Sequence, residues 1–437
     1  MTRATPACRI LVLSQFCMLA AGQALPPEVL AVARASALVR KTVAALANCA
    51  CLESVARSRI YQKGKKREED RDALQIEVTT IGQREWFSWP GRENGFVEDP
   101  ASLVGYGLVG AGEFTSDLQT IFLDNFAVRT FRGAATFQAR PAFRFDYSIR
   151  SVFTRYILRS ESGAITAAGM QGSFWIDPRT SELLAVSSDA TEIPPDFPIR
   201  SVHNEIIYAP MYLDDQRVSL PQTASVVMVD SSGLVSSNYI EFSHCHTFSS
   251  ASSISFDEAH ATAAGSAESL PRAAREPSPL PRGLTLPLRL ASPLTAHSAV
   301  GERFSATVDM PIRSRGAIIV PKGAAVRGRV RRIETASCPS PCLTLAVELL
   351  TVQGADGEAH PVYASLQRVD PESKVSKDID RVTESVESLF AGGIQRTAVQ
   401  SIRLPEIPGV GSFFVLTPDL TTPPDMLMTW TTEGPRP

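Results

Sequence analysis

The sequence predicts a mainly β protein that begins with one amphipathic helix and continues as two β-rich domains. Short segments in which apolar and polar residues alternate recur along the chain, with turn residues between them. The strongest is Phe143–Arg150, where Phe143, Phe145 and Tyr147 alternate with polar or charged residues. Aromatic residues make up only 7% of the 437 residues, and 31 prolines and 27 glycines argue against an all-helical bundle. Because no helical pattern separates the later strands, we expect an antiparallel sheet.

Residues 1–24 have the pattern of a secretory signal peptide. Arg3 and Arg9 give a positive start, an apolar stretch covers residues 10–21, and Gly22-Gln23-Ala24 supplies small residues for cleavage. The apolar stretch is shorter than the ~20 residues that span a bilayer, so we favour cleavage over retention as an anchor. The mature chain is expected in the periplasm or secreted, not as an integral membrane protein. Loss of the two arginines changes the net charge from −3 to −5.

The cysteines are expected to form disulfides, because an exported chain meets an oxidising compartment. Two of the seven leave with the signal peptide. Cys338 and Cys342 flank the rigid segment Pro-Ser-Pro, which favours a local bridge. Cys245 is expected to pair with either Cys51 or Cys49, and the sequence leaves this choice open. The disulfide candidates are therefore Cys51, Cys245, Cys338 and Cys342.

A helix is predicted from Pro26-Pro27 to about Asn48. Its apolar residues follow three- and four-residue spacing, and they are Val29, Val32, Val39, Val43 and Leu46. The stripe is narrow, which favours packing on a sheet over binding to a membrane surface.

Two further segments near the start of the chain are interpreted as loops. The charge run 62–72 mixes both signs and is expected to be a solvated loop or hairpin tip. Residues 105–117 hold four glycines but lack a phosphate-binding motif. They predict a loop that leads into a short helix capped by Thr115 or Ser116.

The chain divides at a segment rich in Ser, Ala and Pro. We expect a signal peptide at 1–24, a first domain at 25–250, a linker at 251–282 and a β-rich domain at 283–437. In the first domain, further strands are predicted at 74–78, 86–89, 152–159, 172–176, 183–187, 205–212, 225–229 and 238–242. Asp177-Pro178 opens a turn in one hairpin.

Residues that could perform chemistry are few, and we expect no catalytic site, metal site or cofactor. His244-Cys245-His246 is the densest histidine cluster, but a third metal ligand is not evident in the pattern. Nucleic acid is not an expected partner, because basic and acidic residues are nearly balanced, at 43 and 46. Arg327, Arg329, Arg331 and Arg332 form a basic strip, which we interpret as an exposed strand face.

Two resemblances follow from these residues. The helix over 29–46, the series of strands and the segment GSFWIDPRTSELL (172–184) resemble the periplasmic lipoprotein-carrier family, of the LolA and LppX type. More narrowly, NCACLES, FSWPG, GSFWIDP and FSHCHTF resemble a group of secreted proteins from soil bacteria, and carry no known activity. The pattern GLTLP with IIVPKGAAVRGRV, within 283–335, resembles more weakly the barrel of type IV secretion and conjugation scaffolds.

The resemblance implies a fold and a function. The first domain should be an open antiparallel half-barrel with the helix beneath it, and the second a small β-barrel-like domain. The half-barrel implies a non-enzymatic protein that binds or carries a hydrophobic ligand, a lipid or lipoprotein acyl chain. Candidate lining residues are Phe143, Phe145, Tyr147 and Trp175, although the same residues would also suit a filled core. The alternative is an envelope scaffold that binds protein partners and no small molecule.

Overall fold

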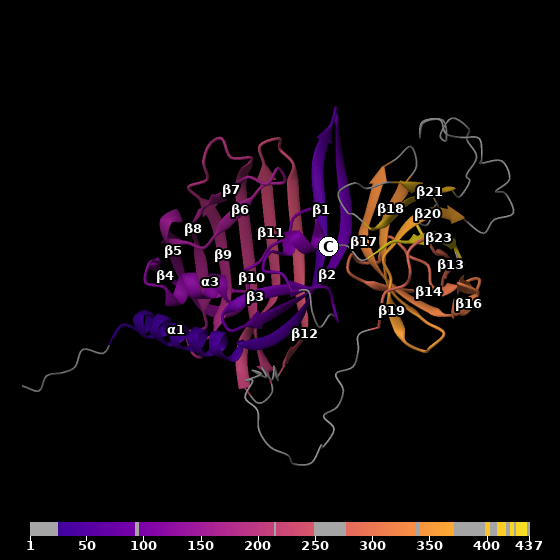
Figure 1. Ribbon diagram of the computed structural model, residues 1–437. Coiled ribbons are helices and arrows are strands. Elements are labelled where there is room, and N and C mark those ends of the chain that lie inside the picture. Colours follow the sequence, from indigo (N-terminus) through magenta and orange to yellow (C-terminus); the bar gives the residue numbers. More distant parts are fainter. Residues whose placement is uncertain are drawn as a thin grey trace, which may run out of the picture.

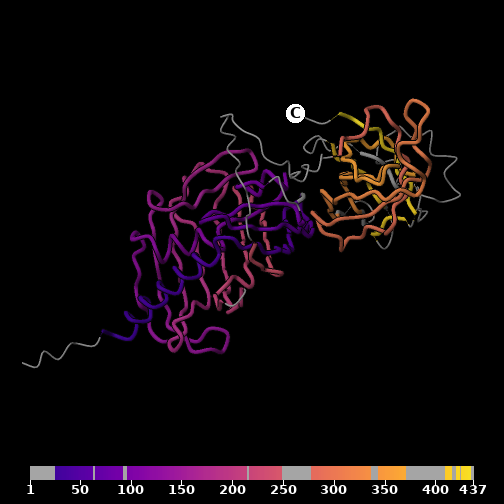
Figure 2. The backbone as a smooth tube through the Cα atoms, turned by 60° about the horizontal axis from the view of Figure 1, so that its bottom comes forward, coloured from indigo at the N-terminus to yellow at the C-terminus, as the bar shows by residue number. Residues whose placement is uncertain are grey.

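A computed structural model describes residues 25–91, 96–213, 216–248, 277–337, 341–370, 398–402, 409–416, 420–423 and 425–434. The chain is mainly β, as predicted. Figure 1 shows two groups of strands side by side: a large open sheet built from β1 to β12, and a smaller group built from β13 to β23. In the second view the two groups again lie next to each other (Figure 2).

The large sheet is antiparallel and runs in the order β3-β2-β1-β12-β11-β10-β9-β8-β5-β4. It is an open half-barrel, not a closed barrel. Its strands are β1 (Asn48–Lys63), β2 (Lys66–Ile81), β3 (Arg84–Ser88), β4 (Val128–Phe137), β5 (Arg140–Ile149), β8 (Gly169–Ile176), β9 (Leu183–Thr191), β10 (Ile199–Leu213), β11 (Gln216–Asp230) and β12 (Val235–Thr247). A small hairpin, β6 (Ile157–Arg159) and β7 (Ile165–Ala167), stands apart.

The second group is also antiparallel, and the barrel-like closure expected for it stays a prediction. Its strands are β13 (Thr285–Leu290), β14 (Arg303–Val308), β15 (Ile312–Ser314), β16 (Ala317–Val320), β17 (Ala325–Ser337), β18 (Pro341–Gln353), β19 (Ala359–Pro361), β20 (Ala364–Asp370), β21 (Ala398–Ile402), β22 (Gly411–Leu416) and β23 (Leu427–Thr432). The main order is β20-β23-β13-β14-β17-β18-β22-β21. Alternate residues of β14 are buried, which places one face in the core.

The helix α1 (Pro27–Ala45) packs against β8, β11 and the segment before β4. Its start agrees with Pro27 at the first turn, where the missing N–H is tolerated. The predicted stripe is confirmed toward the end of the helix, where Val39, Val43 and Leu46 are buried. Nearer its start Val29 is exposed, and Ala31 and Ala35 are buried in its place.

Short helical segments fill the connection from β3 to β4. They are α2 (Pro100–Val104), α3 (Ser116–Leu118) and the π-helical turn η1 (Gln119–Leu123). The short helix predicted after the glycine-rich loop is confirmed, with Thr115 at its cap position. By contrast, 152–159 is not one strand: the 3-10 turn η2 (Ser151–Phe153) comes first, and only three residues form β6.

The charge run 62–72 belongs to the tip of the β1–β2 hairpin, as one of its two interpretations predicted. The prediction that the whole run is exposed to solvent was wrong at its last residue. The Asp72 carboxylate is buried, because it faces the Arg57 guanidinium across the two strands.

The two groups of strands meet along β2. The backbone N–H of Gln75 donates to the carbonyl of Val300 (2.6 Å), and the N–H of Val300 donates to the carbonyl of Ala73 (2.6 Å). A bridge also joins Arg71 to Thr335 of β17. The second group therefore continues the hydrogen bonding of the first at this edge.

The basic strip lies at this meeting point, so its interpretation as an exposed strand face is wrong. Arg329 is 0% exposed, and its guanidinium carbon is 5.4 Å from the centroid of the Trp89 ring. The Arg331 guanidinium lies 5.1 Å from the same ring and pairs with Glu348 at 2.9 Å. Only Arg327 of the strip is exposed. The Trp89 ring therefore lies near both guanidinium groups, and Glu348 supplies the counter-charge of Arg331.

Several sequence predictions lie outside the described residues. They are the signal peptide at 1–24, Cys338 with the side chain of Cys342, and most of the proposed linker. In the part of the chain that is described, no helix is long and apolar enough to cross a membrane.

Candidate ligand-binding cavity

A cavity of about 260 Å³ lies between α1 and the sheet. The helix contributes its second half, and the sheet contributes β10 and β11. The start of β9 and α3 complete the wall. Its lining residues are Ala35, Leu38, Val39, Lys41, Thr42, Leu118, Glu182, Leu183, Tyr208, Arg217, Val218 and Ser219.

The walls are chiefly apolar. Val39, Leu118, Leu183 and Val218 are buried side chains that belong to the main core, while Leu38 is partly exposed at the opening. Thr42 and Tyr208 are buried polar residues of the wall, and the Tyr208 hydroxyl donates to the backbone carbonyl of Glu113 at 3.4 Å. Burial, with nearby Asp117, raises the pKa of Tyr208 well above its usual value. The phenol is therefore neutral at any ordinary pH.

Charged side chains stand at the mouth. Arg217 Nη1 lies 2.7 Å from Glu182 Oε1, and the Arg217 side chain is half exposed. Lys41 follows on the outer side of the helix and is exposed. The mouth thus presents two cations and one carboxylate around an apolar interior.

The glycine-rich loop packs inside the half-barrel. Arg57 Nη1 donates to the carbonyl of Tyr106 (3.0 Å), and Asn238 Nδ2 donates to the carbonyl of Leu108 (3.0 Å). Gly107 (φ +72) lets the loop backbone come this close to Arg57, because a Cβ at this position would lie 3.0 Å from Arg57 Nη1. This segment occupies the inner face near β1 and β12, so that part of the half-barrel is filled by the chain itself.

Buried carboxyl groups surround the end of this loop. Glu85 accepts hydrogen bonds from the N–H groups of Gly112 and Thr115, both at 2.8 Å. Burial, with the nearby Glu85 charge, raises the pKa of Glu113 to about 8 and that of Asp117 to about 7. Burial also raises the pKa of Glu53 well above its usual value, with contributions from Glu113 and Glu85. These groups favour the neutral form, because desolvation penalises the carboxylate.

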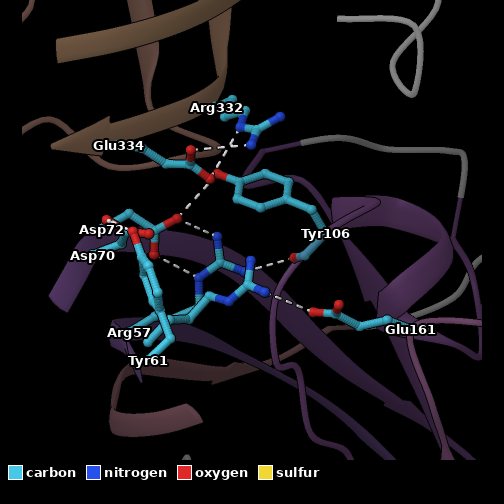
Figure 3. Close-up of polar contacts among 9 residues, drawn as sticks. Arg57, Tyr61, Asp70, Asp72, Tyr106, Glu161, Arg332 and Glu334 are labelled. Atoms are coloured by element: carbon cyan, nitrogen blue, oxygen red, sulfur yellow. Dashed lines mark hydrogen bonds and ion pairs between the residues drawn. The ribbon is translucent and has the colours of Figure 1, made fainter. Parts of the chain in front are cut away.

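A second polar cluster lies where the two groups of strands meet (Figure 3). The ring of Tyr106 lies between two guanidinium groups: that of Arg57 is 4.7 Å from the ring centroid, and that of Arg332 is 5.0 Å away. The Tyr106 hydroxyl donates to Asp72 Oδ2 at 3.0 Å. Arg332 pairs with Glu334 at 3.0 Å. The space beside this cluster measures only about 20 Å³, room for a single water.

The four aromatic residues predicted to line a cavity do not lie at the one described above. Phe145 and Tyr147 are buried in the core, where the Phe145 ring stacks on Phe174 with centroids 5.1 Å apart. Phe143 shares their face and is half-buried. A ligand-binding role for these residues stays a prediction.

Trp175 points to the opposite face of the sheet. It pairs in register with Arg144, whose guanidinium lies 5.9 Å from its ring centroid, and contacts Phe137. Its neighbour Phe174 occupies the inner position that the aromatic pattern suggested for Trp175. Strict alternation could have identified Phe174, because it shares a face with the apolar Ile176 two residues later, whereas Trp175 between them points to the other face.

The disulfide of Cys51 with Cys245 is present, which settles the choice between Cys51 and Cys49. It connects β1 to β12 across neighbouring strands. Cys49 is buried beside it, with its Sγ 3.9 Å from Cys51 Sγ. The β-bulge between Ala50 and Leu52 places Cys51 in reach of its partner, a detail of register that the sequence does not reveal.

Among the described residues, no group of three or more His, Cys, Asp or Glu side chains could hold a metal ion. His244 and His246 are exposed, and His246 Nδ1 lies 3.0 Å from the His244 carbonyl oxygen.

Comparison with known proteins gives matches among solved structures. A LolA superfamily protein from Nitrosomonas europaea has a TM-score of 0.26 and 10% identity, over 49% of this chain and 94% of that chain. A DUF1329 family protein from Desulfovibrio piger has a TM-score of 0.23 and 11% identity, over 51% and 95%. The MucA/MucB complex structure of Pseudomonas aeruginosa gives 0.16 and 11%, over 92% and 94%. No family model and no curated protein matches.

These matches agree with the predicted resemblance to lipoprotein-carrier proteins over about half of the chain. At such identities and TM-scores, the likeness carries no conclusion about ligand or mechanism. The resemblance of 283–335 to a secretion scaffold barrel stays a prediction.

Proposed function

We propose that this protein is a non-enzymatic carrier of a hydrophobic ligand, and that the ligand's acyl chain enters the cavity between α1 and the β10–β11 hairpin. The observation that carries the proposal is the cavity itself: about 260 Å³ with walls of Val39, Leu118, Leu183 and Val218. Binding pockets are typically concave and apolar with a few polar groups, from about 300 Å³ upward. This volume suits one acyl chain segment and not a whole lipid.

The polar groups of the site suggest how such a ligand would lie. Each methylene moved from water into the cavity contributes about 0.8 kcal/mol. An anionic head group would remain at the mouth, near Lys41 and Arg217. Glu182 forms an ion pair with Arg217, so its carboxylate would repel an anionic head group placed directly on the Arg217 guanidinium. A single-chain amphiphile with an anionic head is therefore the ligand class that we propose.

We further propose that the protein works in the periplasm or outside the cell. An apolar ligand needs a carrier only where it must cross water. The disulfide Cys51–Cys245 supports an oxidising compartment. We also retain residues 25–250 and 283–437 as two domains joined by a linker at 251–282, which limited proteolysis followed by mass spectrometry would test.

A fluorescent fatty acid titration of the full chain tests the carrier proposal. We expect saturable binding that decanoate displaces, and a large loss of affinity in Leu38→Trp, which would block the opening. Ala37→Trp is the matched control, because Ala37 is the exposed neighbour of Leu38 on α1. No binding by folded protein, or equal binding by both variants, would overturn the proposal. Organic extraction of freshly purified protein would show any ligand that co-purifies.

A further inference from the structure

The outer edge of the large sheet at β4 is open. β4 pairs with β5 on one side, and no other strand of the described chain pairs with it. None of its ten residues is buried. The opposite edge is different, because β3 has only five residues and Phe87 exchanges backbone hydrogen bonds with Val97 at 2.7 and 2.9 Å. Long open edges are ordinarily shortened or covered, since they present unpaired N–H and C=O groups.

Exposed apolar side chains gather beside this edge. Phe126 and Phe153 stack at 4.6 Å between centroids although they are 51% and 44% exposed. Val128 and Val152, at the same end of β4 and β5, are 66% and 69% exposed. Phe131 lies at the rim of the inner face and contacts Phe143 and Phe145. An apolar patch of this kind on an otherwise polar surface marks an interaction site.

The charge of the region is positive. Residues 124–168 hold seven arginines and three acidic residues, in a chain with a net charge of −3. At the edge itself, Arg132 and Arg144 share one carboxylate, Asp146, at 2.6 and 3.2 Å. One guanidinium charge is thus left without its own counter-charge on the outer face of β4 and β5.

We propose that β4 accepts an extended segment of a partner polypeptide as an added strand. The backbone edge recognises main-chain groups, which only an extended peptide supplies in the required row. Side chains of an added strand would alternate between the two faces. Apolar residues would face Phe131, and acidic residues would face Arg132. The partner chemistry is therefore an extended segment that alternates apolar and acidic residues.

Other occupants fit these observations less well. A second copy of this chain, paired antiparallel through the middle of β4, would bring Arg132 near its own equivalent, which like-charge repulsion disfavours. A membrane surface could take up the exposed phenylalanines but would leave the hydrogen-bonding groups of β4 unpaired. The proposal is independent of the cavity, because β4 contributes no residue to that lining.

The test uses the full chain and a fluorescent peptide as long as β4 that alternates valine and glutamate, with a valine–lysine peptide as control. Successive residues of an antiparallel strand direct their N–H groups to opposite sides. Of Ala134→Pro and Ala135→Pro, one therefore removes a bond to β5 and the other only an outward N–H. We expect the variant that loses only an outward N–H to keep the wild-type Tm. The same variant should bind the valine–glutamate peptide roughly tenfold or more weakly.

A charge variant sharpens the result. Arg132→Glu should reverse the preference, so that the lysine peptide binds better. Arg84→Glu, on the opposite edge strand, should leave the preference unchanged. Equal binding of the two peptides, or equal affinity in wild type and both proline variants, would overturn the proposal. So would binding to phosphatidylglycerol vesicles without peptide binding, or a dimer in sedimentation that is lost in the proline variants.

Discussion

Arg57 and Asp72 face each other across the β1–β2 hairpin and form a buried ion pair. Arg57 Nε donates to Asp72 Oδ1 at 2.7 Å, and the two side chains are only 4% and 7% exposed. The remaining donors and acceptors are also used: Arg57 Nη1 binds the carbonyl of Tyr106, and Asp72 accepts from the Tyr106 hydroxyl. One ion pair therefore holds the glycine-rich loop in the half-barrel and lies next to β17.

Substitution of Asp72 tests the role of this pair. Asp72→Asn keeps the shape but leaves the Arg57 charge buried without its counter-charge, so we expect a loss of about 3–5 kcal/mol in the free energy of unfolding. Glu69→Gln is the matched control on the same strand, because its pair with Arg71 is largely exposed. We expect less than about 0.5 kcal/mol there. Urea unfolding of both variants gives the values, and equal losses would contradict a special role for Asp72.

The buried carboxyl groups predict a dependence of stability on pH. Glu113 and Asp117 have folded-state pKa values raised to about 8 and about 7, from usual values of 4.5 and 3.8. Within these windows the folded state holds more protons than the unfolded state, so stability is full below pH 4 and falls as pH rises toward 8. Each group contributes a slope of at most about 1.4 kcal/mol per pH unit.

Thermal unfolding between pH 4 and 9 measures this dependence. The neutral variants Glu113→Gln and Asp117→Asn should flatten the decline, because neither side chain then ionises. Glu98→Gln, an exposed carboxylate paired with Arg84, should leave the profile unchanged. A wild-type profile that rises from pH 5 to pH 8 would contradict the assignment of raised pKa values.

The disulfide should contribute strongly to stability. Cys51 and Cys245 are 194 residues apart in sequence, so the bridge closes a long loop in the unfolded chain. We expect Cys51→Ser combined with Cys245→Ser to lower the free energy of unfolding by about 2–5 kcal/mol. Cys49→Ala is the comparison, since it removes the adjacent sulfur and leaves the bridge. Mass spectrometry after alkylation without reductant should recover a peptide linked through Cys51 and Cys245, and recovery of a Cys49–Cys245 peptide would contradict the pairing.

Alanine substitutions at two adjacent aromatic residues of β8 should lower the free energy of unfolding by very different amounts. Phe174 is 0% exposed and its ring packs on those of Phe122 and Phe145. Phe174→Ala should therefore cost about 3–5 kcal/mol through the cavity that it leaves. Trp175→Ala removes only contacts with Phe137 and Arg144 on the other face, and we expect about 1 kcal/mol. Chemical denaturation measures both, and a larger loss for Trp175 would mean that the faces are reversed.

Much of the fold follows from local patterns. The helix from Pro27, the strands around 143–150 and 172–187, and the Asp177 turn depend on hydropathy period and turn chemistry, which neighbouring residues alone express. The oxygen of Asp177 accepts from the N–H groups of Arg179 and Thr180, as its position before Pro178 suggested. The same local signals placed Val39 and Val43 on the buried face of α1 but missed Ala31 and Ala35, because alanine carries little hydropathy signal.

The candidate cavity could not be derived in this way. Its walls come from α1, α3, β9, β10 and β11, and its volume depends on the gap that these elements leave. Of the four aromatic residues predicted to line a cavity, Phe145 and Tyr147 are buried in the core, which agrees with the filled-core alternative that the sequence left open. Which apolar residues fill a core and which border a space is decided by long-range packing.

Local sequence patterns are enough to predict the mainly β class, the leading helix, the half-barrel resemblance and the two alternative partners of Cys245. Tertiary structure decided the rest. A β-bulge at Cys51 allows its disulfide with Cys245. Arg329 is buried near the Trp89 ring, and Asp72, at the end of the charge run, pairs with Arg57. In each case the deciding partner lies on another strand or far away in the sequence, and the fold brings it within a few ångströms.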